Sequence, residues 1–336
     1  MSTAATSSWA SEGTAAPVTL TRRAVVSGIV TLAITPGRTS AQPDGRVRRV
    51  GIFAQARSTR DDLVGALRAR GWSEGRNLAV DWHSAERSET QIGDYLARMP
   101  PDVLVMAGPH RIRAAMRATT AIPIIGIDLE SDPVVGGFVT TLARPGANVT
   151  GIWMDLPELA GKQIQFLREV GPRLQRLGVV WDDRIGQPQF SVLEAAARPA
   201  GIALLPAGLR ATTEVEGVLK RVLAERPQAI VLLTAPVVFS SLGRIAELTH
   251  RSRMPSITPF STYPSAGGLM AYGPDFPAMW LQLSSYIDRV LRGARAGDLP
   301  VERPSKFSLI LNLKTARHLG LAISQSLIFR ADEVIQ

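Results

Sequence analysis

Short, uninterrupted apolar runs alternate with longer amphipathic stretches along most of this chain. The clearest runs are Val103 to Met106, Ile124 to Ile127 and Ile230 to Leu233. Such runs are typical of parallel strands that helices cover on both faces. The stretches between the runs have helical length and one apolar face: Asp61 to Arg70, Arg111 to Thr119, Glu158 to Val170, Glu214 to Glu225 and Leu242 to Arg251. This alternation predicts an α/β protein with doubly wound parallel sheets.

The pattern of the first half is repeated in the second half. Segment 49–53 (RVGIF) resembles segment 176–180 (RLGVV), and segment 99–106 resembles segment 226–233 at the same spacing. Each half then continues with a helical stretch and another short apolar strand. The repeat predicts two similar lobes in tandem, and two such lobes that face each other enclose a cleft. In open sheets of this kind, ligands bind beyond the carboxyl ends of the strands.

Composition agrees with a binding protein or an enzyme that has two cores. The chain has 336 residues, of which 45% are hydrophobic and 20% are charged, with a net charge of +9. Its basic residues are spread along the expected helices and are not interleaved with aromatic residues, which indicates a solvated basic surface and no nucleic-acid partner. The chain contains no cysteine. Disulfides, thiolate metal sites and a lipoprotein anchor on a cysteine are therefore not expected.

Residues 1–41 have the order of an export signal. Arg22 and Arg23 precede an uncharged, mostly apolar stretch from Ala24 to Ile34, and the small residues Thr39-Ser40-Ala41 follow. The apolar part is too short to span a membrane, and the paired arginines are typical of the twin-arginine route. We expect cleavage near Gln42 and a periplasmic protein without a lipid anchor. The alternative is an irregular start on a cytosolic protein.

The sequence offers little for catalysis. Its four histidines are isolated, and it has no Gly-rich phosphate loop, nucleophile elbow or dinucleotide fingerprint. The close carboxylates Asp182-Asp183 and Glu130 with Asp132 could do acid/base work, but acidic residues at strand ends more often cap the next helix or hold a ligand's ammonium group. We therefore expect no enzyme activity, no catalytic residues, no metal and no cofactor.

Several blocks resemble those of a known family, the ABC transporter substrate-binding proteins of the tryptophan/tyrosine-binding type. The resemblance extends in order over residues 47 to 335. The blocks are 71–77 (GWSEGRN), 132–134 (DPV), 142–151 (LARPGANVTG), 158–162 (ELAGK), 267–275 (GGLMAYGPD) and 311–316 (LNLKTA).

The resemblance implies a periplasmic binding protein fold of type I, in which the chain crosses between the lobes three times. On that basis residues 47–147 plus 268–293 would form the first lobe, and residues 148–267 plus 298–336 the second. The extra strand from Leu269 and the helix that follows it agree with this organisation. A monomer is implied that closes on a small-molecule ligand and docks on the transmembrane subunits of an ABC permease.

Candidate ligand-binding residues follow from the expected strand ends. Residues before a helix can offer backbone N–H groups to a carboxylate, and apolar walls with a few polar groups suit an amino-acid-like ligand. The first lobe contributes Gln55, Ser58, Gly108, Pro109, His110, Asp128, Ser131 and Asp132. The second contributes Trp181, Asp182, Thr234, Phe260 and Tyr263.

Some of these residues have simpler roles open to them. Asp132 before Pro133 suits a helix cap, and Gly108-Pro109 suits a turn. Trp181 suits a core position as well as a stacking surface, and His110 stands where the family resemblance implies a small residue, so it could face solvent. The expected function is a solute receptor for an ABC permease. A ligand sensor of the sugar-repressor lobe order without a DNA-binding domain, or an α/β enzyme of unknown reaction, are the alternatives.

Overall fold

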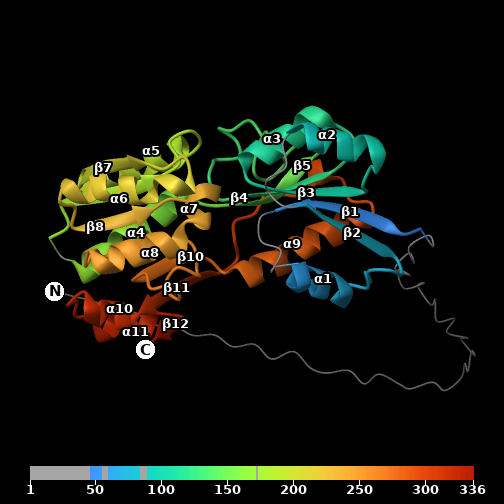
Figure 1. Cartoon of the computed structure of the whole chain (residues 1–336). Coiled ribbons are helices and arrows are strands. Elements are labelled where there is room, and N and C mark those ends of the chain that lie inside the picture. The colour runs from blue at the N-terminus through green and yellow to red at the C-terminus, as the bar shows by residue number, and fades with distance from the viewer. Residues whose placement is uncertain (1–45, 55–59, 84–88, 172) are drawn as a thin grey trace, which may run out of the picture. The chain divides into compact units, whose positions relative to one another are not determined.

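The computed structural model describes residues 46–54, 60–83, 89–171 and 173–336 (Figure 1). The strands are β1 (Arg48–Phe53), β2 (Leu78–His83), β3 (Val103–Ala107), β4 (Ile124–Asp128), β5 (Val149–Trp153), β6 (Arg176–Trp181), β7 (Ala203–Gly208), β8 (Ala229–Leu232), β9 (Ser256–Thr258), β10 (Met270–Pro274), β11 (Phe307–Asn312) and β12 (Glu333–Ile335). The helices are α1 (Arg60–Ala69), α2 (Glu89–Arg98), α3 (Pro109–Ala118), α4 (Leu156–Val170), α5 (Gln187–Ala197), α6 (Val215–Ala224), α7 (Pro236–Ser240), α8 (Leu242–Arg251), α9 (Phe276–Leu291), α10 (Leu313–His318) and α11 (Gln325–Arg330).

The strands form two sheets with the same order of pairing. The first sheet has the order β2-β1-β3-β4-β5, and all its pairs are parallel. In the second sheet, β7-β6-β8-β9-β10 repeats that order, and β11 and β12 extend it beyond β10. The segments 49–53 and 176–180, which resemble each other in sequence, lie in β1 and β6, the equivalent strands of the two sheets. The expected two-lobed α/β fold is thus confirmed, with one addition: β10 and β11 pair antiparallel, so the second sheet is mixed.

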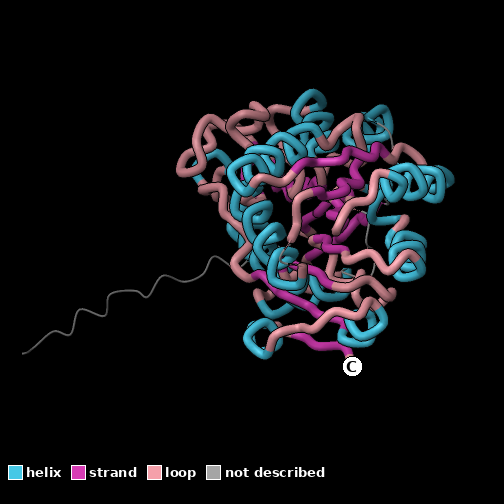
Figure 2. Tube along the Cα trace, turned by 90° about the vertical axis from the view of Figure 1, so that its left-hand side faces the viewer, coloured by secondary structure: helices cyan, strands magenta, loops and turns pink. Residues whose placement is uncertain are grey.

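Helices cover both faces of each sheet, as Figure 2 shows with helices in cyan on either side of strands in magenta. In the first lobe, one face of the sheet packs on the side of Leu63 and Leu283, and the other on the side of Ile92 and Ile112. In the second lobe, the two faces have separate cores of the same kind. Burial on both faces explains why the strands read as continuous apolar runs.

The expected lobe boundaries need two corrections. Residues 148–153 were expected to open the second lobe, yet β5 pairs with β4 in the first sheet. Residues from 268 were expected to return to the first lobe, yet β10 pairs with β9 in the second sheet. The physical reason is that the chain leaves each sheet only after its fifth strand has been added. β10 is therefore the fifth strand of the second repeat and not a leftover strand.

The two lobes exchange helices. After β5, α4 packs in the second lobe, where Ala160 and Phe166 join the core of β6 and β8. After β10, α9 returns to the first lobe and lies beside α1 (Figure 1). There Arg70 Nε donates to Ser284 Oγ at 2.9 Å and Trp72 Nε1 donates to Asp288 Oδ1 at 2.8 Å. Each lobe's core thus includes a helix whose preceding strand belongs to the other lobe.

The first two crossings share a local sequence, an aspartate followed two residues later by a proline. Asp155 accepts a hydrogen bond from Glu158 N (3.2 Å) at the start of α4, and Asp275 accepts one from Ala278 N (3.0 Å) at the start of α9. Aspartate is a preferred N-cap, and proline is tolerated in the first helical turn because no N–H is needed there. The same device therefore starts both exchanged helices.

The third crossing joins the other two through ion pairs. It leads from the first lobe, where Glu302 N donates to Gly151 O (3.0 Å), to β11. Along it, Arg303 Nε lies 3.7 Å from Asp155 Oδ2, and Lys306 Nζ lies 2.7 Å from Asp275 Oδ2. The hydrogen bond from Lys306 lowers the pKa of the Asp275 carboxyl. Both helix caps are thus tied to the same connecting segment.

A glycine pair brings β4 and β5 into close contact. Gly151, with φ of 138°, is paired with Gly126, and a Cβ on Gly151 would lie 2.0 Å from the Gly126 carbonyl oxygen. A Cβ on Gly126 would in turn lie 2.4 Å from the Trp153 ring. Neither glycine can take a side chain without moving the fifth strand.

None of the helices in the described part of the chain is long and apolar enough to cross a membrane.

We predict that Gly151→Ala lowers the free energy of unfolding by about 2 to 3 kcal/mol, because the added methyl group collides with backbone at a strained φ. Urea-induced unfolding measures the change. The control is Gly161→Ala in α4, where a Cβ meets nothing within 4 Å. This control should gain about 0.5 to 1 kcal/mol, since alanine is the better helix former. Equal stabilities of the two variants would contradict the account of the β4–β5 contact.

Candidate functional site

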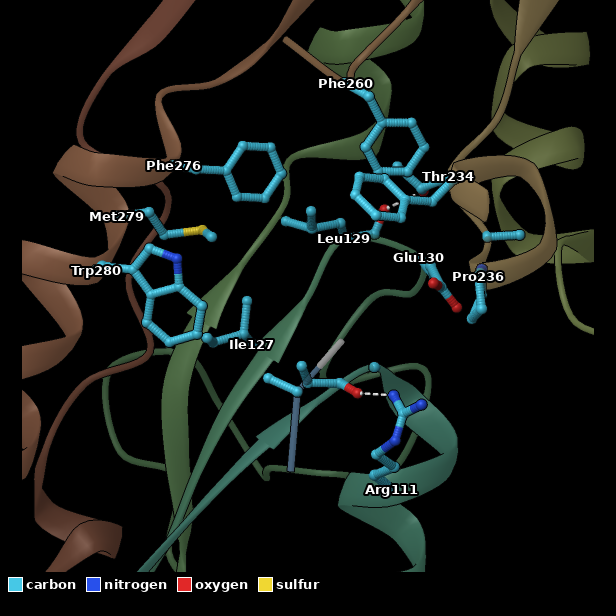
Figure 3. A pocket seen from close by; sticks show the side chains of 15 residues that line it. Arg111, Ile127, Leu129, Glu130, Thr234, Pro236, Phe260, Phe276, Met279 and Trp280 are labelled. Carbon is cyan, nitrogen blue, oxygen red and sulfur yellow. Dashed lines mark hydrogen bonds between the residues drawn. The ribbon is translucent and has the colours of Figure 1, made fainter. Parts of the chain in front are cut away.

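A cavity of about 130 Å³ lies between the lobes at the carboxyl ends of their strands (Figure 3). The first lobe lines it from the ends of β1, β3 and β4 and from the first turn of α3, and the second lobe from the segments after β8 and β9. The exchanged helix α9 completes the wall. The lining residues are Ala54, Ala107, Gly108, Arg111, Ile127, Leu129, Glu130, Thr234, Ala235, Pro236, Phe239, Phe260, Phe276, Met279 and Trp280. This location is the one expected for a ligand site of an open α/β sheet.

Most of the wall is apolar or aromatic. Phe276, Met279 and Trp280 come from the first two turns of α9 and lie on one side of the cavity (Figure 3). From the second lobe, the rings of Phe239 and Phe260 meet edge to face, with centroids 5.1 Å apart. Such walls hold the hydrophobic body of a ligand and give it flat surfaces to pack on.

Two charged side chains, Arg111 and Glu130, lie on the other side of the cavity (Figure 3). Arg111 stands in the first turn of α3, and its guanidinium donates a hydrogen bond to the Ala107 carbonyl oxygen. Burial lowers the pKa of Arg111, and the charge of Glu130 opposes that shift. The cavity therefore has one polar end and one apolar end.

Glu130 is held in a setting that disfavours its charge. Glu130 is half-buried, and its side chain lines the cavity. Burial, and after it the charge of Asp128, raise the pKa of Glu130 to about 8, with Arg111 acting in the opposite direction. A carboxyl group with such a pKa holds its proton at neutral pH until a cation comes close.

Asp128 fixes the turn that presents Glu130. It is fully buried at the end of β4 and accepts hydrogen bonds from Glu130 N (2.7 Å), from Ser131 N (3.2 Å) and from the Ser131 hydroxyl. Burial raises the pKa of Asp128 to about 6, while these hydrogen bonds oppose the shift. Asp128 and Ser131 thus serve the geometry of the site without lining the cavity.

Thr234 connects the lobes at the cavity. The side-chain amide of Gln189 pairs with the backbone of Thr234 in both directions, at 3.0 Å to Thr234 N and 2.8 Å to Thr234 O. This pairing positions the Thr234 hydroxyl, which lies 2.9 Å from the Leu129 carbonyl oxygen of the first lobe and also within reach of the Gln189 Oε1. A hydrogen bond from Thr234 to Leu129 would have to break before the lobes separate here.

The structure places the candidate residues in three different settings. Gly108, Thr234 and Phe260 line the cavity. Pro109 is buried, His110 is exposed on α3, and exposed Asp132 accepts hydrogen bonds from Val134 N and Val135 N, as a cap does. Gln55 and Ser58 lie outside the described residues.

Two of the aromatic candidates pack within the second lobe, away from the cavity lining. Trp181 is buried and stacks on Phe190 with ring centroids 4.7 Å apart. Tyr263 is fully buried, and its hydroxyl bonds with Ser256 Oγ at 2.8 Å and Thr249 Oγ1 at 3.1 Å. Trp181 is the last residue of an apolar strand and Tyr263 follows another, and at such positions sequence alone does not distinguish a core aromatic from one at a ligand site.

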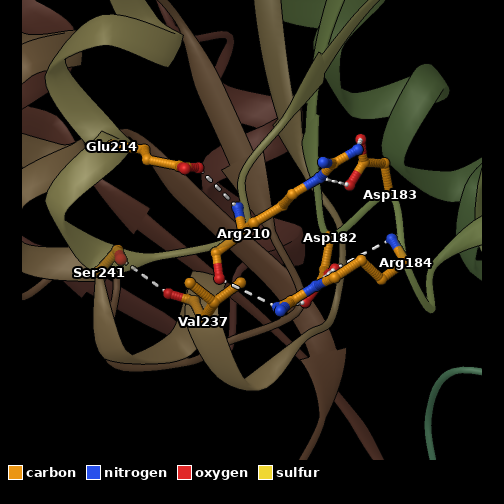
Figure 4. Close-up of polar contacts among 7 residues, drawn as sticks. All are labelled: Asp182, Asp183, Arg184, Arg210, Glu214, Val237 and Ser241. Carbon is orange, nitrogen blue, oxygen red and sulfur yellow. Dashed lines mark hydrogen bonds and ion pairs between the residues drawn. The ribbon is translucent and has the colours of Figure 1, made fainter.

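The paired aspartates after β6 bind neighbouring arginines (Figure 4). Asp182 is buried and accepts two hydrogen bonds from the Arg184 guanidinium, at 2.9 and 2.6 Å. Asp183 accepts two from Arg210, at 2.7 and 2.8 Å, and these lower the pKa of Asp183. With its pKa lowered by Arg210, the Asp183 carboxyl group is poorly suited to carry a proton near neutral pH. The described residues also hold no cluster of three or more side chains that could bind a metal.

Several lining residues were not among the candidates, chiefly Arg111, Glu130, Phe239, Met279 and Trp280. Glu130 lies in the strand-end segment that the sequence did single out, and Arg111 lies in the first turn of an expected helix. A search that extended from each strand end through the next helical turn would have found both. Met279 and Trp280 lie on α9, and which of its faces meets the cavity depends on the helix exchange.

Two α/β lobes with three connections and a cavity at their strand ends define a solute-binding protein of the periplasmic binding protein type. The model of the ABC transporter substrate binding protein family matches residues 55–335. The chain belongs to this family. Among its relatives, the tyrosine-binding protein of Clostridioides difficile (strain R20291) is 23% identical over 264 residues, which are 77% of this chain and 75% of that protein.

Solved structures share the fold. A conserved domain protein from Vibrio cholerae O1 biovar El Tor has a TM-score of 0.79 at 25% identity, over 86% of this chain and 100% of that chain. An ABC domain from Streptococcus pneumoniae, solved in complex with L-Trp, has a TM-score of 0.77 at 21% identity with the same coverage. The ligand-free, open form of a Clostridium difficile substrate-binding protein with adhesive properties has a TM-score of 0.64 at 22% identity, again with the same coverage.

The raised pKa of Glu130 predicts a pH-dependent cost in stability. Since the pKa of about 8 in the folded protein exceeds the unfolded value of about 4.3, the folded state holds the proton more tightly. The free energy of unfolding therefore falls as the pH rises between these values and levels off above about 8. Without ligand, Glu130→Gln should match the wild type near pH 4 and be about 1 to 3 kcal/mol more stable near pH 8.5, a figure reduced for solvent in the cavity.

Urea-induced unfolding at both pH values measures this difference. The matched control is Glu225→Gln, which removes an exposed carboxylate at the end of α6. The control should show the same stability difference from the wild type at both pH values. If the difference in free energy of unfolding between Glu130→Gln and the wild type is also the same at both pH values, ionisation of Glu130 costs nothing in the folded protein.

Proposed function

We propose that this protein is an exported solute receptor, which binds an amino-acid-like ligand with an apolar or aromatic body between its lobes and delivers it to an ABC permease. The observation that carries the proposal is the cavity itself, with an arginine and a carboxyl group at one end and aromatic walls at the other. An amino acid with a hydrophobic side chain has the same division of polar and apolar parts. The named relatives, one a tyrosine-binding protein and one solved with L-Trp, support this ligand class.

The other parts of the proposal rest on the family and the sequence. Members of this family serve ABC transporters, so the protein partner we propose is the transmembrane permease, and the receptor acts as a monomer without enzyme activity. Residues 1–41 lie outside the described residues, and their order of paired arginines, apolar stretch and small residues supports export to the periplasm. Binding requires no chemical step, because enclosure between two hinged lobes is enough to hold a solute.

The test of the ligand site is Phe239→Ala. Phe239 forms part of the aromatic wall and is only partly buried, so its removal should leave the fold intact. For an aromatic amino acid such as L-tryptophan, titration calorimetry should show a loss of about 1 to 3 kcal/mol in binding free energy, because an aromatic contact in a desolvated site is lost. The matched control is Phe329→Ala, since Phe329 is 85% exposed on α11.

Unchanged affinity in the Phe239 variant, with wild-type binding intact, would place the ligand elsewhere. If none of tryptophan, tyrosine, phenylalanine or the aliphatic amino acids binds the wild-type protein, the proposed ligand class is wrong.

A further inference from the structure

We propose that Glu130 accepts hydrogen bonds from the amino group of the ligand and that Arg111, with the first turn of α3, donates hydrogen bonds to its carboxylate, so that the cavity selects zwitterionic amino acids over acids or amines of the same shape. The proposal rests on the function proposed above and adds to it the two residues that set ligand class.

The ionised form of Glu130 has no hydrogen-bonded cation among the described residues. Glu130 has a backbone N–H bonded to Asp128, but its carboxylate has no hydrogen bond to any residue in the described part of the chain. Three charged groups from the described part of the chain act on it: Asp128 from the end of β4, Asp182 from the segment after β6, and Arg111 from α3. Both aspartates oppose ionisation of Glu130, and each already has its own partners. A ligand ammonium in the cavity would add a second positive charge to that of Arg111 and would favour the ionised form of Glu130.

Arg111 and the start of α3 suit a carboxylate. α3 has ten residues and begins with Pro109, so the N–H groups of His110 and Arg111 have no acceptor within the helix. Gly108, with φ of 91°, precedes the helix and lines the cavity without a side chain. Helix N-termini favour anions, and a guanidinium can bond both oxygens of a carboxylate. The same turn thus offers backbone and side-chain donors to one negative group.

Within the described ranges, the remaining wall has no further charge to offer. Apart from Arg111 and Glu130, all the described lining residues are uncharged, and the side across from them is Phe276, Met279 and Trp280. A plain carboxylate would pair with Arg111 but gain no ion pair at Glu130, which would keep its proton, and a plain amine would leave the buried Arg111 without an anion. Burial of the Arg111 charge unpaired is costly, and each analogue lacks one of the two charge-assisted contacts that a zwitterion makes.

Binding of an ammonium should also move a proton. Because Glu130 holds its proton in the unliganded protein at neutral pH, a ligand ammonium that pairs with it favours the carboxylate form. The proton then leaves Glu130 for solvent, and the ligand keeps all of its own protons. Affinity should accordingly increase as the pH approaches 8 from below.

The test compares L-tryptophan with indole-3-propionic acid, which lacks the amino group, and tryptamine, which lacks the carboxylate. For the wild-type protein we expect tryptophan to bind at least about 100-fold more tightly than either analogue. Glu130→Gln should weaken tryptophan about 10- to 100-fold and leave indole-3-propionic acid unchanged or improved. Calorimetry in buffers of different ionisation enthalpy should give close to one proton released by the wild type near pH 7, and almost none by the variant. Glu225→Gln, the exposed control, should behave as wild type in every assay.

The outcomes separate this inference from the proposed function. If indole-3-propionic acid binds as tightly as tryptophan, or if Glu130→Gln releases as many protons as the wild type, Glu130 is not the acceptor, although the receptor function stands. If the wild type binds tyrosine or an aliphatic amino acid in place of tryptophan, the same comparison with the deaminated form of that amino acid decides the question. If no amino acid binds, the inference and the proposed ligand class are both overturned.

Discussion

The structure depends on the exchange of α4 and α9 between the lobes. Each helix follows the fifth strand of one sheet and packs in the core of the other lobe, so neither lobe completes its core from a continuous piece of chain. The chain must cross where these helices begin, and the ion pairs of Arg303 with Asp155 and of Lys306 with Asp275 tie both starting points to the third crossing. Relative motion of the lobes is thereby concentrated in three short, adjacent segments, as hinge closure requires.

The position of the cavity follows from the same constraint. Strand ends of both sheets face each other across the crossings, and α9 brings Phe276, Met279 and Trp280 to the wall because it starts at a crossing. The polar end is built locally by the Asp128 turn and by the first turn of α3. In this turn the protein keeps two carboxyl groups, Asp128 and Glu130, whose pKa values are raised by burial. Ionisation of such buried carboxyl groups lowers the stability of the folded protein. This is typical of functional sites, where a bound ligand supplies the partner that these groups lack.

Much of the fold could be predicted from the sequence, because the signals that specify it are local. Apolar runs marked β3, β4 and β8, amphipathic stretches marked α1, α3, α4, α6 and α8, and the repeat related β1 to β6. The lobe boundaries were wrong at β5 and β10 because a strand's sheet depends on its neighbours, here through the approach of Gly151 to Gly126. No short-range pattern distinguishes a fifth strand of one sheet from the first strand of the next.

The site was harder to predict for a related reason. The strand-end rule pointed to the region of the cavity and included three of its lining residues, Gly108, Thr234 and Phe260. They could not show that Tyr263 faces a buried pair of hydroxyl groups, or that Asp132 caps a turn two residues beyond Glu130. Which side chain of a turn faces the cavity depends on the hydrogen bonds of Asp128, and the face of α9 depends on the crossing.

The most direct test of the central claim is a crystal structure of the protein with L-tryptophan. The account predicts density for the ligand between the lobes, with its ammonium beside Glu130, its carboxylate at Arg111 and the start of α3, and its indole ring against Phe239, Met279 and Trp280. Ligand density outside this cavity, or inside it with the amino group turned away from Glu130, would contradict the account.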